Sequence, residues 1–208
     1  VRTIIDMVSA TRLDCVLGSA GTMRAALTRA VHHTRHRRAF GALLVDQPLM
    51  RNVLTDLALE SEAASLLGMR LAHAIDAGDT DLARLGVAVG KYWVCKRATP
   101  HAAEAMECLG GNGYVEDFGM ARLYREAPLM GIWEGSGNVS ALDTLRAMAT
   151  RPECIDVLFE ELALASEPRL NTHVAQLKTS LGDFADIQYR ARKITEDIAL
   201  ALQGALLV

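Results

Sequence analysis

Apolar residues recur every three or four positions along most of the chain, and this spacing restricts the polypeptide to α-helix. One stripe runs from Leu13 to Val31 and a second from Met50 to Ile75. Residues spaced in this way share one face of a helix, whereas a half-buried strand would need strict alternation. Aromatic residues are scarce, and Ala and Leu are abundant, which favours the same structure. We therefore expect an all-α fold.

Glycine and proline divide these stripes into separate helices. The first helix should stop near Gly41, and an extended segment over 42–46 should lead to a second helix that Pro48 opens. Pro100 predicts a kink or a brief break near Thr99 in the third helix. The same signals predict helices at about 81–109, 120–126 and 138–149, a non-helical glycine loop at 110–114, and further helices at about 155–165, 170–181 and 184–207.

These elements predict two parts. Residues 1–149 should form an antiparallel four-helix bundle with short connections, and residues 150–208 a helical extension that begins near Arg151 and Pro152. An amphipathic pattern begins almost at Val1, so we expect the chain to be a piece of a longer protein.

Charge, cysteine and histidine patterns argue against several functions. A net charge of −3 gives no overall attraction to nucleic acid or to an acidic membrane, and no apolar run reaches transmembrane length. The four cysteines form no C-x-x-C pair, which suits reduced thiols and a cytoplasmic location. His32 and His36 have a chelating spacing, but no third ligand is evident and nearby arginines oppose a cation. No metal site is therefore predicted.

Four motifs follow one another in a specific order. They are Arg37–Gly41, Glu107–Tyr114, Tyr124–Ala127 and Ile132–Gly137. In this order and spacing, residues 1–149 resemble the C-terminal helical domain of acyl-CoA dehydrogenases. The segments EAMECLGGNGY, RLYRE and IWEGSGN are similar to the sequences of the alkylation-response, or adaptive-response, subgroup of that family.

Glu134 is the predicted catalytic residue. Removing a proton beside a thioester carbonyl needs a positioned carboxylate. The resemblance implies that Glu134 takes the α-proton of an acyl-CoA while a hydride passes from the β-carbon to FAD, and that its backbone N–H helps to hold the thioester carbonyl. Some family members place the base on the first helix, where Thr11 stands here, and a threonine cannot do that work. The alternative for Glu134 is a solvated loop glutamate.

The residues after this glutamate are expected to contact FAD. Gly135 lets the backbone approach a flavin phosphate closely, and the Ser136 hydroxyl can donate a hydrogen bond. Asn138 is expected to cap the next helix, whose positive end would face an anion. An ordinary loop and cap would use the same residue types. The resemblance also assigns Arg12 and Gly135 to the acyl-CoA site, with a buried or capping arginine as the alternative for Arg12.

A second group of residues is expected at the FAD of a neighbouring subunit. Arg37 can clamp a pyrophosphate, since a guanidinium matches phosphate oxygens in a fork. Its alternative is a solvated basic helix end, which the helix dipole favours. Glu107 departs from the family pattern, because many relatives have glutamine there. The resemblance gives this group the further members Ala39, Phe40, Gln47, Glu107, Gly110 and Gly111.

The resemblance also implies partners. They are an acyl-CoA substrate, a homo-oligomer (dimer or tetramer) formed through the bundle, and an electron-transfer flavoprotein. In the family, a β-rich middle domain holds the flavin ring and an N-terminal helical domain encloses part of the acyl chain. Neither is in this sequence, so we expect the isolated chain to bind FAD weakly or not at all and to have no turnover.

Trp133 stands where tyrosine is common and would narrow an acyl pocket.

Two other functions stay open. Proteins of the alkylation-response subgroup are associated with DNA binding through the region that follows the dehydrogenase domain. Residues 151–208 carry six basic and nine acidic side chains, with Arg190, Arg192 and Lys193 as their tight basic cluster. DNA binding generally needs clustered positive charge, which ranks this function below flavin chemistry. The other alternative is a helical bundle that only drives oligomerisation.

Overall fold

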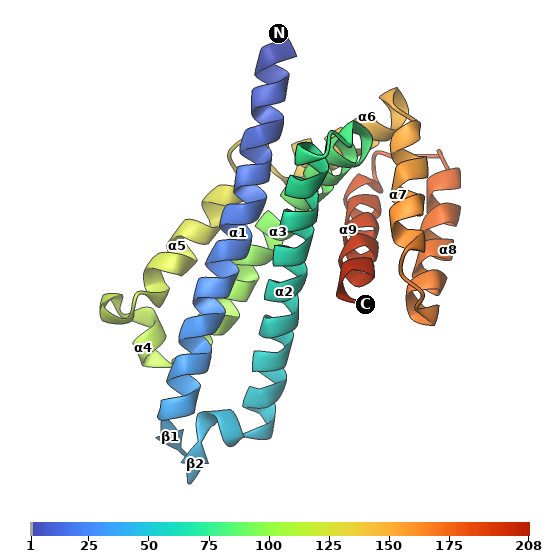
Figure 1. Ribbon diagram of the computed structural model, residues 1–208. Helices are drawn as coiled ribbons and strands as arrows, with labels where there is room; N and C mark the ends of the chain where they lie inside the picture. Colours follow the sequence, from blue (N-terminus) through green and yellow to red (C-terminus); the bar gives the residue numbers. More distant parts are fainter. Residues whose placement is uncertain (1) are drawn as a thin grey trace.

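The structure, a computed structural model, describes the backbone of residues 2–208 and the side chains of residues 7–208. The described residues form nine α-helices and one short hairpin (Figure 1). In chain order the elements are α1 (Arg2–His36), β1 (Arg38–Ala39), β2 (Ala42–Leu43), α2 (Pro48–Asp76), α3 (Thr80–Glu107), α4 (Gly111–Tyr114), α5 (Met120–Met130), α6 (Gly137–Thr150), α7 (Glu153–Ala163), α8 (Pro168–Gly182) and α9 (Ala191–Leu207). The all-α fold class is confirmed. None of the described helices is long and apolar enough to cross a membrane.

Three long helices, α1, α2 and α3, form the framework of the fold and pack against one another (Figure 1). The β1–β2 hairpin reverses the chain between α1 and α2. A turn over Ala77–Asp79 reverses it again, and Asp79 caps α3 by accepting a hydrogen bond from the Leu82 N–H at 3.2 Å. Because both connections are short, neighbouring helices run antiparallel.

The hairpin differs from the helix end expected at Gly41. α1 ends before it, and Phe40 (φ 53°) and Gly41 (φ 83°) both lie in the left-handed region. Two consecutive residues of this kind make the tight turn that suits a two-residue hairpin. The conformation is strained for a bulky residue, and the Phe40 side chain is 93% exposed. The extended segment expected over 42–46 is confirmed at Ala42–Leu43, but Leu44–Asp46 form a 3₁₀ turn.

Three further boundaries differ from the sequence prediction. α3 continues through Pro100 without the brief break that was one of two possibilities near Thr99, because packing against α1, α2, α5 and α6 offsets the lost hydrogen bond. The glycine loop expected over 110–114 contains the helical turn α4, where tertiary contacts override low helix propensity. α5 extends to Met130 and includes Pro128.

Gly113 lets the α4 turn fit against the end of α3. A Cβ atom there would lie 2.2 Å from the backbone oxygen of Met106. We expect Gly113→Ala to lower the free energy of unfolding by about 1–3 kcal/mol, the usual cost of overpacking. Thermal unfolding measures this loss. Gly111→Ala is the matched control, because its Cβ would meet no atom within 4 Å; equal melting temperatures for the two variants would contradict the close contact.

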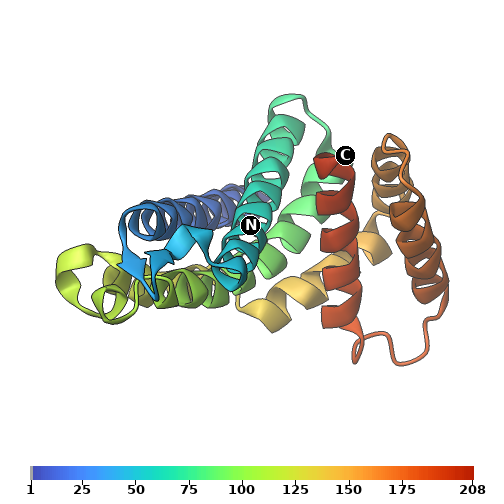
Figure 2. The same cartoon turned by 90° about the horizontal axis from the view of Figure 1, so that it is seen from below.

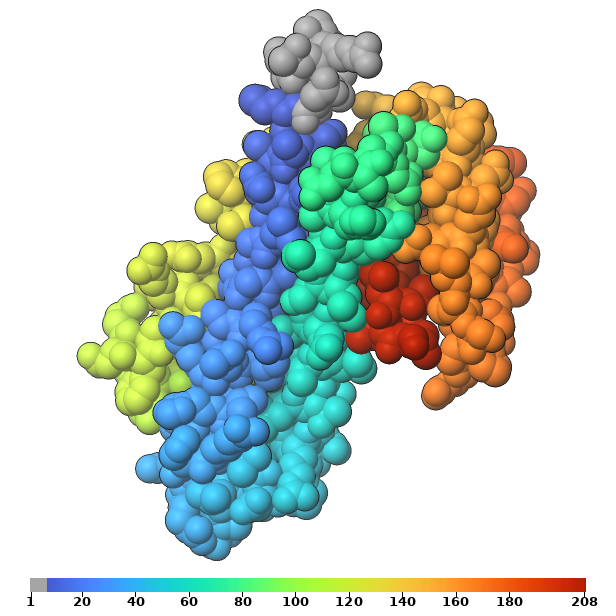
Figure 3. Space-filling view, viewed as in Figure 1, coloured from blue at the N-terminus to red at the C-terminus, as the bar shows by residue number. Residues whose placement is uncertain are grey.

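The helices after residue 150 share the core of the bundle. α9 lies between the long helices and the α7–α8 pair, in contact with α2, α3, α6, α7 and α8 (Figure 2). It begins at Ala191, since residues 185–190 form turns in the region where a helix start was expected. In the space-filling view α9 fills the recess between α2 and α7 (Figure 3).

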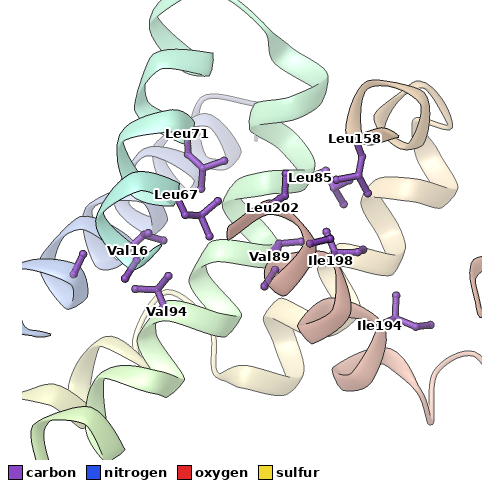
Figure 4. Close-up of a cluster of buried hydrophobic side chains, with 14 of the residues drawn as sticks. Val16, Leu67, Leu71, Leu85, Val89, Val94, Leu158, Ile194, Ile198 and Leu202 are labelled. Carbon is purple, nitrogen blue, oxygen red and sulfur yellow. The ribbon is translucent and has the colours of Figure 1, made fainter. Parts of the chain in front are cut away.

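One apolar cluster crosses the predicted boundary between the two parts (Figure 4). Ile194, Ile198 and Leu202 of α9 pack in the same cluster as residues of α1, α2, α3 and α7. These partners include Val16, Leu67, Leu71, Leu85, Val89 and Leu158. A contiguous cluster of this kind is the core of one packed unit. The division into 1–149 and 150–208 stays a prediction.

The four cysteines are buried free thiols. Burial raises the pKa of Cys95 and of Cys108 to about 11. Thiols of this kind stay protonated at neutral pH and pack as small apolar side chains.

Candidate functional site

Glu134 lies in the loop between α5 and α6. It is partly buried, and its backbone is left-handed, with φ 57°. A residue other than glycine keeps this conformation only where its surroundings hold it. Arg12 on α1 supplies one such restraint, because its Nε donates to the Glu134 carbonyl oxygen at 3.0 Å. The peptide at the predicted base is thus fixed by a side chain 122 residues earlier in the chain.

Gly135 occupies a position that other residues would not fit. Its φ is 107°, and a Cβ there would lie 3.0 Å from Cγ1 of Val139 and 3.3 Å from Nη2 of Arg12. The structure therefore brings together Arg12, Glu134 and Gly135, the residues predicted for proton abstraction and substrate binding. Their chemical roles stay predictions.

Asp143 on α6 holds Arg12 in place. Its Oδ2 accepts a hydrogen bond from Arg12 Nη1 at 2.6 Å, and its two oxygens accept from Arg84 on α3 at 2.8 and 3.0 Å. Burial would raise the pKa of Asp143, but the hydrogen bonds and charges of Arg84 and Arg12 outweigh it and lower that pKa. The carboxylate consequently links α1, α3 and α6 directly behind the Glu134 loop.

The cap of α6 is Ser136 and not Asn138, which corrects the sequence prediction. The Ser136 carbonyl already accepts from the Ser140 N–H at 3.0 Å, so the helix begins one residue earlier than expected. The exposed Ser136 side chain makes no capping bond. Asn138 is the second residue of α6, and its Oδ1 accepts from Arg192 Nε of α9 at 2.7 Å. α9 therefore contacts the start of the helix that follows Glu134.

The second predicted group gathers where α1 and α3 end, at the end of the bundle that carries β1, β2 and α4 (Figure 1). Of its members, Arg37 lines a cavity of about 530 Å³ there. Of the other members, Ala39 and the exposed Phe40 lie in the hairpin, and Gln47 precedes α2. Glu107 is the exposed last residue of α3, the exposed Gly110 (φ 59°) precedes α4, and the exposed Gly111 is the first residue of α4. The predicted residues thus form two separate groups.

The cavity at this end is basic. Its lining contains Arg29, Arg37 and three histidines, and no carboxylate from the described part of the chain. Burial, together with the charges of Arg37 and His32, lowers the pKa of His33. His36 Nδ1 lies 2.7 Å from the His32 carbonyl oxygen, and the described residues hold no group of three side chains placed to bind a metal ion. Such a lining favours an anionic ligand.

Three charged residues near Glu134 were not predicted as site residues. They are Lys91, Arg84 and Asp143. Lys91 is 2% exposed and donates from Nζ to the carbonyl oxygens of Met130 at 2.7 Å and Gly135 at 3.1 Å. Its signal in the sequence is a lysine in the middle of an otherwise apolar run from Leu85 to Cys95. Arg84 and Asp143 carry no such signal.

Comparisons with known proteins give matches to one family. Residues 1–149 match the family described as the C-terminal domain of acyl-CoA dehydrogenase. AidB of Escherichia coli (strain K12) is 46% identical over 164 residues, and acyl-CoA dehydrogenase family member 11 of Caenorhabditis elegans is 32% identical over 187 residues. These matches cover 77% and 86% of this chain but 30% and 29% of the relatives, so the chain spans about a third of their length.

Solved structures extend the similarity to the last helices. Caenorhabditis elegans ACDH-11 in complex with C11-CoA is 29% identical with a TM-score of 0.89, and the match covers 99% of this chain and 40% of that one. Butyryl-CoA dehydrogenase from Megasphaera elsdenii is 28% identical with a TM-score of 0.64, and the match covers 68% of this chain and 37% of that one. The family match ends at residue 149, so helices α7–α9 belong to a fold that ACDH-11 also has. Matched over most of its length, this chain belongs to the acyl-CoA dehydrogenase family, as its C-terminal domain.

Proposed function

We propose that this chain acts within a longer flavin-dependent oxidoreductase, in which Glu134 removes the α-proton of an acyl-CoA thioester. The observation that carries the proposal is the left-handed backbone of Glu134, held by Arg12 beside Gly135. A partly buried carboxylate on a restrained backbone suits a positioned base. The acyl-CoA in the ACDH-11 structure supports the same substrate class for this chain.

The described residues fit parts of FAD, the cofactor that this family uses. Arg37 borders a basic cavity that suits a pyrophosphate. Ser136 and the first N–H groups of α6 can bind a further phosphate or ribityl oxygen. When bound, FAD supplies a hydride acceptor for the β-carbon of the acyl group.

The chain's own residues contribute three functions to this reaction. The Glu134 carboxylate takes the α-proton, and the Glu134 backbone N–H donates a hydrogen bond to the thioester carbonyl oxygen as negative charge develops there. Arg12 keeps the peptide in position for both. The test is the Glu134→Gln substitution in the full-length protein, which is argued in the Discussion.

We further propose that the protein works as a homo-oligomer, a dimer or a tetramer. The Arg37 group and the Glu134 group lie at different places on the bundle, which supports contacts with the FAD of a neighbouring copy by the first and with the same-chain FAD by the second. Electrons would leave through an electron-transfer flavoprotein. The 46% identity with AidB supports a place in the alkylation-response subgroup.

The 208-residue chain alone is expected to bind FAD weakly or not at all and to have no turnover. The reason is that it covers 30% of AidB, and the β-rich domain of the family would lie in the remainder. The measurement is the visible absorbance of the purified chain after incubation with FAD and gel filtration, with the full-length protein as the control. A stoichiometric flavin spectrum on the 208-residue chain would contradict this expectation.

DNA binding by the extension has less support. Each member of its basic cluster already has a partner within the chain: Arg190 contacts Ser180, Asp183 and Ala185, Arg192 contacts Asn138, and Lys193 pairs with Asp197. Contacts of this kind compete with phosphate groups for the same donors. We therefore keep the flavin-dependent reaction as the first proposal and a DNA-binding role as the second.

A further inference from the structure

Lys91 is a buried lysine that no ion pair explains. It lies in the middle of α3, is 2% exposed, and is among the largest fully buried side chains. Among the described side chains, no carboxylate lies within ion-pair distance of its Nζ; its two hydrogen bonds go to backbone oxygens instead. Burying an ammonium group is costly unless other contacts compensate for the lost water. Its presence therefore calls for a role that an apolar side chain could not fill.

The two oxygens that Lys91 contacts stand at the two ends of one loop. Met130 is the last residue of α5, and Gly135 lies two positions before Gly137, the first residue of α6. The Met130 carbonyl belongs to the last turn of a helix, where carbonyl groups lack intrahelical partners and favour a cation. By donating to both oxygens at 2.7 and 3.1 Å, Lys91 closes residues 131–134 into a loop of fixed span.

Glu134 lies inside this closed loop, next to the second contact. Its carbonyl oxygen is held separately by Arg12 from α1 at 3.0 Å. Two consecutive residues, Glu134 and Gly135, have positive φ, and a free loop would leave this conformation easily. The backbone is consequently restrained by one cation on α1 and one on α3.

We propose that Lys91 is a positioning residue, which acts through the Met130 and Gly135 carbonyls to hold Glu134 where its carboxylate can reach the α-carbon. This inference rests on the proposed role of Glu134 as the base. In this role Lys91 acts on the carboxylate through the loop backbone and not by contact with the substrate or the flavin.

The test is Lys91→Met in the full-length protein. Methionine matches the apolar stem of the lysine side chain but has none of its three donors. We expect faster amide hydrogen exchange in residues 131–137 with unchanged exchange in α1. We also expect kcat per bound flavin to fall about 100-fold, the typical effect of a small misplacement, with KM nearly unchanged. Lys178→Met, an exposed lysine on α8, is the matched control and should behave as the unsubstituted protein.

Two outcomes would overturn the proposal. One is unchanged exchange in residues 131–137 of Lys91→Met, and the other is an unchanged kcat. If Glu134→Gln alone retains full activity, the proposed function fails, whereas the exchange result still reports on Lys91. Should Lys91→Met not fold, proton–nitrogen NMR of the unsubstituted protein tests the contact instead. We expect the ammonium protons of Lys91 to exchange slowly with water and to show proximity to Gly135. Exchange as fast as that of the Lys178 ammonium protons would contradict the contact.

Discussion

Replacing Glu134 with glutamine in the full-length protein is expected to lower the rate of acyl-CoA dehydrogenation by a factor of about 10²–10⁴, the usual contribution of a positioned base. Glutamine has the same shape as glutamate and can take the same backbone conformation, but it cannot accept the α-proton. The same substitution should abolish exchange of the α-proton of a bound acyl-CoA with solvent. Flavin content should not change, because the substitution leaves the backbone and the shape of the side chain at position 134 as they are.

The measurement is the exchange of α-deuterium from a labelled acyl-CoA, alongside the steady-state rate and the flavin absorbance. Glu126→Gln is the matched control, since Glu126 is an exposed carboxylate on α5 that pairs with Arg122 on the protein surface. Retained α-proton exchange in Glu134→Gln would exclude this residue as the base. Loss of flavin from the same variant would instead point to a binding role.

Replacing Asp143 with asparagine is expected to lower the free energy of unfolding at neutral pH by about 3 kcal/mol, the low end of the range for breaking a buried pair. The Asp143 and Arg12 side chains are each 13% exposed, and Arg84 is 27% exposed. Asparagine keeps the shape but leaves two guanidinium groups without a counter-charge. For a chain of this size the loss corresponds to a fall in melting temperature of about 6–12 °C. Thermal and urea unfolding measure it.

The pH dependence of this effect follows from the lowered pKa of Asp143. A carboxylate whose pKa is lower in the folded than in the unfolded state stabilises the fold fully above its ordinary value of 3.8. That stabilisation is lost as the pH falls from there through the folded-state pKa. The stability difference between Asp143→Asn and the unsubstituted protein should therefore be largest at neutral pH and shrink in acid.

Asp14→Asn serves as the control for charge removal, because Asp14 is exposed on α1. It should change stability little at any pH. A difference for Asp143→Asn that stays constant from neutral pH to pH values well below the ordinary value of 3.8 would show that packing, and not charge, explains the loss.

At the candidate site, sequence motifs predicted some of the residues and missed others. The sequence motif around Glu134 and Gly135 identified a loop in which the structure gives two consecutive residues a positive φ. Lys91 contacts this loop directly and Asp143 holds Arg12, and neither residue belongs to one of the four motifs. They lie 44 positions before Gly135 and 131 positions after Arg12 along the chain. Their partners are backbone oxygens or distant arginines, and the sequence does not record such pairings.

Local rules also failed where tertiary contacts outweighed them. Asn138 is a good capping residue by type, but the structure uses its side chain to bind Arg192 of α9. Phe40 was expected in a helix end and instead occupies a left-handed hairpin turn. Pro100 lies within a continuous helix that four other helices support. In each case, neighbours from other parts of the chain decided the conformation.

The amino-acid sequence by itself determined the helical fold class, the approximate place of most helices, and the motifs around Arg37, Gly110 and Glu134. These properties depend on residues within a few positions of one another, where spacing and residue type are sufficient. The tertiary structure alone decided that α9 packs into the bundle core, and that Lys91, Arg12 and Asp143 restrain the Glu134 loop. Those contacts depend on the three-dimensional packing of helices far apart in the chain, which no local pattern encodes.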